Sequence, residues 1–223
     1  MAQSARGRNQ EERWFKMLFF AFDILHRRVF GETDITERIV IEPDGCDYVM
    51  RYFSPAEVRT ELPPQSKRIL ERRKLRKGQD AFVLEREGFL EYLHDMPALY
   101  GEVLGVNGSR PIPKRLLIAL LALHECRHKA HARKLVRHVS ERNILDRMDG
   151  HLPKREHPEF VHLSTQFFQM VLEITEELKS IPPDETDAYL VEALGLYFWE
   201  RSRTSDLSLL AKHFSRFVLL APR

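Results

Sequence analysis

The sequence is short of cysteine, of long apolar runs and of any large surplus of one charge. Its two cysteines, Cys46 and Cys126, are too few for a disulfide framework or for a zinc ribbon built from cysteines. The longest uninterrupted apolar run extends from Leu116 to Leu123, far below the roughly 20 residues that a membrane-spanning helix needs. The formal net charge is only +2, so the overall charge does not indicate nucleic acid or anionic lipid as the partner.

The features of a secretory signal are also missing near the N-terminus. The apolar run at residues 17–22 is preceded by Glu11 and Glu12 and followed by Asp23. No small-residue cleavage site comes after it. We therefore expect a cytoplasmic protein that does not associate with a membrane.

The composition that remains is typical of a globular protein. Hydrophobic residues make up 43% and charged residues 30% of the 223-residue chain, which provides enough volume for a sizeable core. We expect a flexible tail over residues 1–10 and a single domain over residues 11–223. The Pro-rich stretch 54–66 is a candidate linker within it.

The apolar patterning predicts an α+β fold with a mainly helical C-terminal half and a small antiparallel hairpin or sheet. Apolar residues at helical spacing predict a first helix over 13–30. Two strands, 38–42 and 47–53, flank a Pro- and Gly-containing turn at 43–46 and predict a β-hairpin. Further helices are expected over 85–95, 113–147, 158–181, 184–202 and 206–219.

The most informative residues are His124 and His128, in the string His-Glu-Cys-Arg-His directly after the long apolar run. At 3.6 residues per turn the two imidazoles lie on one helix face, one turn apart, as two ligands of a tetrahedral zinc ion must. Glu125 projects about 100° further round the helix, beside such an ion, where it can accept a proton from water. Zinc lowers the pKa of a water that it binds to about 7 and polarises a carbonyl. The string therefore predicts a zinc-dependent hydrolase with Glu125 as catalytic general base.

This H-E-x-x-H string resembles the motif of the zincin metallopeptidases, in particular the gluzincin type, in which a glutamate is the third zinc ligand. In such families that glutamate often lies on a later helix in a Glu-x-x-Ala context. The segment from Glu185 to Ala188 is similar to that element. The resemblance implies a zincin-like fold, a zinc ion held by His124, His128 and Glu185, and a protein or peptide as substrate.

Three of the residues that follow His124 differ from those in the motifs of zincin families. The metzincin continuation is excluded, because His131 stands where its glycine belongs and Lys134 where its third histidine belongs. Arg127 occupies a position at which most zincin motifs carry an uncharged residue. His131 lies roughly 10 Å from His124 along the helix axis, too far to share one ion with it, and we expect it to be a solvent-side neighbour.

The third ligand has two candidates, Glu185 and Glu192. Glu185 also has a structural explanation, since acids in a first helical turn complement the helix dipole. Glu192 lies in the apolar segment 188–199, where a buried carboxylate needs a cation or hydrogen-bond donors facing it. The two are seven residues apart on one helix face, so one could bind the metal while the other orients a ligating histidine. Tyr189 or His162 could supply the donor that a developing oxyanion requires, although packing or capping explains both.

Glu-x-x-His spacing also supports a di-iron carboxylate protein, because ferritin-like bundles use it. The order of elements does not match such a bundle, and the predicted hairpin is foreign to it. The spacing occurs three times, at Glu91/His94, Glu125/His128 and Glu159/His162.

A nucleic-acid-binding or scaffold protein with structural histidines is the remaining alternative. In that case the histidines would be bonded to backbone or carboxylates and would hold no metal. Basic side chains along the long helix, Arg127 and Lys129 among them, could extend a phosphate-binding surface. The local cluster that would begin this surface consists of Lys67, Arg68, Arg72, Arg73, Lys74, Arg76 and Lys77.

Overall fold

Helices dominate the described part of the chain, where a small three-stranded sheet accompanies them, as the α+β prediction requires. The computed structural model describes residues 5–30, 38–42, 50–62, 64, 67–68, 80–105, 112–132, 155, 157–174 and 183–202. Its elements in chain order are α1 (Ala5–Phe30), β1 (Arg38–Glu42), β2 (Met50–Phe53), α2 (Glu57–Thr60), β3 (Ala81–Glu85), α4 (Arg86–Val103), α5 (Lys114–Ala132), α7 (His157–Ile174) and α8 (Pro183–Ser202).

The predicted β-hairpin is wrong, although both of its strands exist. The sheet has the order β1-β3-β2, so that β3 lies between the two strands that were expected to pair. β1 runs parallel to β3, with Ile39 opposite Phe82, and β2 runs antiparallel to it, with Tyr52 opposite Phe82. A central strand that is buried on both faces has a continuous apolar run and does not alternate between apolar and polar residues. For this reason the alternating pattern of a half-buried strand is absent from β3. The predicted turn at 43–46 lies outside the described residues.

Each face of β3 packs against a different part of the chain. Phe82 faces α1, where its ring centroid lies 5.8 Å from that of Phe15 and 4.8 Å from that of Phe19. Val83, on the opposite face, belongs to a smaller cluster with Leu62, which is 2% exposed. Leu62 follows α2, so part of the Pro-rich stretch 54–66 packs onto the sheet.

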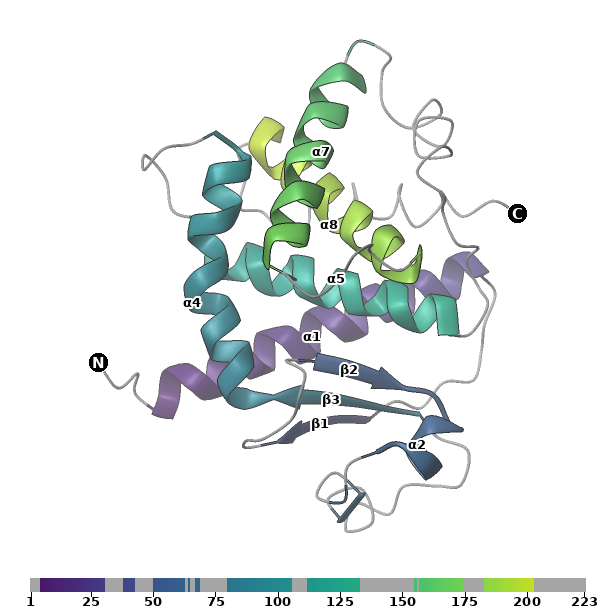
Figure 1. Ribbon diagram of the computed structural model, residues 1–223. Helices are drawn as coiled ribbons and strands as arrows, with labels where there is room; N and C mark the ends of the chain where they lie inside the picture. The colour runs from purple at the N-terminus through teal and green to yellow at the C-terminus, as the bar shows by residue number, and fades with distance from the viewer. Residues whose placement is uncertain are drawn as a thin grey trace.

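The central element of the fold is α5. Its residues from Leu116 to Leu123 are all buried, because α1, α4, α8 and β2 contact it from different sides. Figure 1 shows α1 and α5 crossing between the sheet and the pair α7 and α8. The hydrophobic core therefore surrounds α5, and the polar string that ends this helix is held in a fixed position.

Several helix limits differ from those expected. α1 begins at Ala5, within the stretch expected to be a flexible tail, and Glu11 near its start is buried and bonded through Oε1 to Lys114 Nζ at 3.1 Å. α4 continues past Pro97 to Val103, because the buried Tyr100 anchors its second half in the core. α5 begins as predicted after Pro113, but the expected extension to residue 147 and the last helix at 206–219 lie outside the described residues.

Candidate metal centre

The two histidines of the motif lie near the end of α5, one helical turn apart. His124 is 6% exposed and His128 is partly buried. Their Nε2 atoms are 3.0 Å apart, and their ring centroids are separated by 4.7 Å. The buried run that precedes His124 fixes the rotation of α5, so both rings point toward α8.

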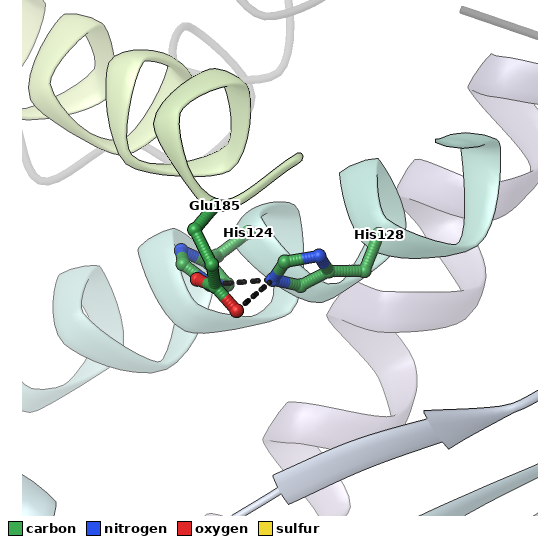
Figure 2. Close-up of side chains that lie close together, drawn as sticks. All are labelled: His124, His128 and Glu185. Atoms are coloured by element: carbon green, nitrogen blue, oxygen red, sulfur yellow. Dashed lines mark hydrogen bonds and ion pairs between the residues drawn. The ribbon is translucent and has the colours of Figure 1, made fainter. Parts of the chain in front are cut away.

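The first turn of α8 brings Glu185 to these histidines. Its Oε2 lies 3.4 Å from His124 Nε2, and its Oε1 lies 3.3 Å from His128 Nε2. Figure 2 shows the carboxylate turned toward both imidazoles from the neighbouring helix. Among the described residues, these three form a group whose ligand atoms all lie within 4.8 Å of one another. The predicted His/His/Glu grouping is thus present, with Glu185 as its carboxylate.

The separations within this group suit a tetrahedral zinc ion. Zinc binds nitrogen and carboxylate oxygen at about 2.0–2.2 Å, which places two ligand atoms of a tetrahedron about 3.3 Å apart. The two Nε2 atoms are 3.0 Å apart, and the carboxylate of Glu185 approaches them with one oxygen each, at 3.3 Å for His128 and 3.4 Å for His124. Glu185 keeps 33% of its side chain exposed, so one side of the group is open to solvent. An ion held there would have an open coordination position, which is typical of catalytic zinc.

The Glu185 carboxyl is ionised, which is the form that binds a cation. Burial by itself would raise its pKa, but hydrogen bonds and charge from His124 and His128 outweigh burial and hold the pKa well below its ordinary value. A carboxylate that stays ionised at neutral pH can bind a cation without first losing a proton.

Glu192, the other candidate ligand, lies behind His124 and outside the ligand group. Its Oε2 is 3.0 Å from His124 Nδ1, and the residue is 2% exposed. Burial raises the pKa of Glu192 above its ordinary value, and the hydrogen bond from Tyr92 opposes that rise. The donors expected to face this carboxylate are therefore present, and one of them is the imidazole of His124. Glu192 has the position of a residue that orients a ligating histidine.

Glu125 is 6% exposed and is not a member of the ligand group. Burial raises the pKa of its carboxyl to about 8; the nearby His128 opposes this rise, and the charge of Glu185 adds to it. A general base works best when its pKa lies close to the operating pH. Position and protonation behaviour are both compatible with the predicted role.

A second polar contact joins α5 and α8, and it was not predicted from the sequence. Arg127 is 2% exposed and donates two hydrogen bonds to Asp187, from Nε at 2.9 Å and from Nη2 at 3.2 Å. His131 Nε2 lies 2.7 Å from the same carboxylate, and the His131 side chain is only 4% exposed, so His131 is not the solvent-side neighbour that we expected. Burial would raise the pKa of Asp187, but the charge of Arg127 and the bond to His131 hold it well below its ordinary value.

This second contact explains why a charged residue is present inside the motif. Positions 127 and 131 repeat the four-residue spacing of 124 and 128 on the adjoining face of α5. Asp187 follows Glu185 by two residues, so the first two turns of α8 supply one carboxylate to each pair. The sequence could have indicated this second contact, because two pairs of residues at four-residue spacing in α5 are matched by two acids near the start of α8.

The two candidate oxyanion donors have different surroundings. The ring centroid of Tyr189 lies 4.7 Å from that of His124. Burial raises the pKa of the Tyr189 hydroxyl, with further contributions from Glu185 and Glu125, so this hydroxyl keeps its proton at neutral pH. His162 is exposed on α7 and takes no part in the ligand group.

The di-iron arrangement is not supported by the structure. Its two additional pairs are solvent-exposed and do not join the ligand group in the described part of the chain. A bundle site would require all of them to point inward. The exposed residues are Glu91, His94, Glu159 and His162.

The basic surface predicted along α5 is wrong where the structure describes it. Arg127 forms an ion pair with Asp187. Lys129 is 3% exposed, and its ammonium lies 6.0 Å from the centre of the Phe19 ring. In the predicted cluster, Lys67 Nζ donates to the Arg59 carbonyl at 3.1 Å. Arg68 is exposed. The remaining members, Arg72, Arg73, Lys74, Arg76 and Lys77, lie outside the described residues.

Comparison with known proteins adds no relative. No protein-family model, no curated protein and no solved structure matches the chain. In the part of the chain that the structure describes, no helix combines the length and the apolar character that crossing a bilayer demands.

Proposed function

We propose that the protein is a zinc-dependent hydrolase of the peptidase type, with the ligand set of a gluzincin. His124, His128 and Glu185 would hold the ion, and Glu125 would act as general base. The observation that carries this proposal is the convergence of the three side chains: the two Nε2 atoms lie 3.0 Å apart, and each lies 3.3 to 3.4 Å from an oxygen of the Glu185 carboxylate, close to the edge of about 3.3 Å of a zinc tetrahedron. Glu192 supports it by engaging the far nitrogen of His124.

The charges around the site also favour a cation. Three carboxyl groups, Glu125, Glu185 and Glu192, lie around two imidazoles, and two of the three have pKa values raised by burial. Histidines with a purely structural role need acceptors, but they do not need three acids. A dication at the centre would oppose the effect of burial and favour the ionised forms of these carboxyl groups.

Each residue then has a chemical task. Bound zinc would lower the pKa of water toward about 7 and polarise the carbonyl of an amide. Glu125 would accept the proton of the attacking water and pass it to the leaving amine nitrogen. Tyr189, which keeps its hydroxyl proton, would donate a hydrogen bond to the oxygen that gains negative charge. Protein or peptide amides are the proposed substrate class, and the cytoplasm remains the proposed location.

Metal content tests the site directly. Untagged protein purified without chelator should contain close to one zinc ion per chain by mass spectrometry, and His128→Ala should contain none. His162→Ala is the matched control, because this histidine is exposed on α7 and should leave the zinc content unchanged. Zinc-free wild type that takes up no zinc on incubation would refute the proposal.

Catalysis is tested separately with Glu125→Gln. The amide keeps the shape of the side chain but cannot accept the proton, so zinc should stay bound while cleavage of quenched fluorescent casein falls by about 100-fold or more. If the variant cleaves as fast as wild type, Glu125 is not the general base.

A further inference from the structure

Two tyrosines of α4 meet behind the candidate zinc site. Tyr92 and Tyr100 both donate hydrogen bonds to Glu192 Oε1, Tyr92 at 3.1 Å. Their hydroxyl oxygens are 3.0 Å apart, and Tyr100 is 1% exposed. Neither residue belongs to the ligand group or to the proposed proton path. The contact thus joins α4 to α8 through one carboxylate oxygen.

The convergence of these two phenols is not a result of helix spacing. Tyr92 and Tyr100 are eight residues apart, a rise of about 12 Å along a regular helix, and Pro97 lies between them. Both side chains therefore lean toward a common point, and that point is Glu192 Oε1. Each phenol has one hydrogen to donate, and a buried carboxylate is the strongest acceptor within their reach.

This arrangement determines what the other oxygen of Glu192 can do. With Oε1 occupied by the phenols, Oε2 faces His124 Nδ1 at 3.0 Å. When Glu192 is ionised, as a cation bound nearby would favour, a hydrogen on Nδ1 satisfies this contact. Nε2 can then offer its lone pair to an ion held with His128 and Glu185, and without the ion the same Nε2 faces the Glu185 carboxylate at 3.4 Å, to which it can donate a hydrogen bond.

We infer that Tyr92 and Tyr100 are positioning residues for the metal site: they hold Glu192 in place, and through it they fix the tautomer and ring orientation of His124. The inference rests on the proposed zinc site and adds that its affinity is set in part from α4, a helix that supplies no ligand. Residues that orient a ligating histidine typically change metal affinity by about 10- to 100-fold when removed.

The experiment compares Tyr92→Phe, Tyr100→Phe and the double variant with Tyr197→Phe as matched control. Tyr197 is buried on α8, and its hydroxyl contacts Glu159 at 3.5 Å, away from the ligand group. Zinc affinity of the full chain is measured by competition with a chromophoric chelator. We expect a loss of about 10- to 100-fold in the double variant, a smaller loss in each single variant, and less than a twofold change in the control.

A second readout does not need the metal. In zinc-free protein, the ¹⁵N shifts of the His124 ring report whether Nδ1 carries a hydrogen. We expect a hydrogen on Nδ1 in wild type and its partial loss in the double variant. Glu192→Gln should lose this hydrogen with both phenols intact, because an amide oxygen that accepts from the phenols places the amide nitrogen, a donor, opposite Nδ1; this variant covers the case in which the double variant fails to fold.

The two proposals can fail separately. Wild type that binds no zinc would remove the proposed function, and the tautomer measurement would still decide the role of the tyrosines. Unchanged zinc affinity, or a His124 ring that stays fully Nδ1–H without the two phenol hydroxyls, would overturn the inference.

Discussion

Replacing Asp187 by Asn should destabilise the protein more than any other conservative change in α8. The carboxylate is 1% exposed and neutralises Arg127, which is 2% exposed. Within the described residues, Arg127 Nη1 has no hydrogen-bond partner, and Asp187 is the acid that pairs with this buried charge. Removing one member of a buried ion pair costs about 3–5 kcal/mol, because the other charge stays buried without a counterion. We expect a loss of this size in the free energy of unfolding.

Replacing Arg127 instead of Asp187 should lower the free energy of unfolding by a smaller amount. In Arg127→Met, Asp187 keeps its 2.7 Å bond to His131, so the buried carboxylate still has a hydrogen-bond partner. A loss of about 1–3 kcal/mol is expected, the range for an unsatisfied buried polar group. The double variant Arg127→Met/Asp187→Leu buries no charge and should be more stable than Asp187→Asn.

Urea unfolding followed by far-UV circular dichroism, in the presence of EDTA, measures all of these differences. Equal m-values across the series would show that the shifts are changes of stability and not of the denatured state. Arg51→Met is the control, since Arg51 pairs with Glu61 at 2.7 Å with both side chains largely exposed and should lose less than about 1 kcal/mol. The reasoning is refuted if Asp187→Asn costs no more than this control, or if the double variant is no more stable than Asp187→Asn.

Three further predictions address the core, the ion and pH. Phe82→Ala should lower the free energy of unfolding by about 3–5 kcal/mol, since its ring fills the space between Phe15 and Phe19; a loss under about 1 kcal/mol in urea would contradict this packing. Zinc at 100 times its Kd should stabilise wild type by about 2.7 kcal/mol and raise its melting temperature, and no such rise should occur in His128→Ala. The folded-state pKa of Asp187 is depressed, so its stabilising contribution is present above the ordinary carboxyl pKa of about 4 and is lost as pH falls through the folded value. Wild type should therefore lose more stability than Asp187→Asn between about pH 5 and pH 3, and parallel losses would argue against the assignment.

The features of the site that sequence reasoning recovered are those set by local periodicity. His124 and His128 are four residues apart on a helix, and any helix places such side chains on one face. Glu192 was identifiable because a carboxylate in an apolar segment must meet donors, and it meets His124 and two phenols. Which of the two acids faces the ligand positions depends on how α8 is rotated against α5, and no local pattern encodes that rotation.

The errors have a common physical origin in burial. Arg127 and Lys129 were read as surface residues because charged side chains are seldom buried, yet Asp187 and the Phe19 ring accommodate them. Tyr92 and Tyr100 were missed because their partner lies about 100 positions away in the chain. The sheet order failed for the same reason: β3 pairs with strands that precede it, and only tertiary packing selects that arrangement.

The position of β3 has a consequence for how the chain folds. β1 and β2 are neighbours in the sequence but not in the sheet, so neither gains a ladder partner until Ala81–Glu85 is available. The sheet cannot nucleate as a local hairpin, and both of its pairings close loops of some 30 to 40 residues, which slows folding relative to local contacts. During synthesis β1 and β2 would leave the ribosome before β3 and would form their ladders only after β3 has emerged. Because β3 passes directly into α4, the strand that completes the sheet is also the one that leads the chain into the helices around the site.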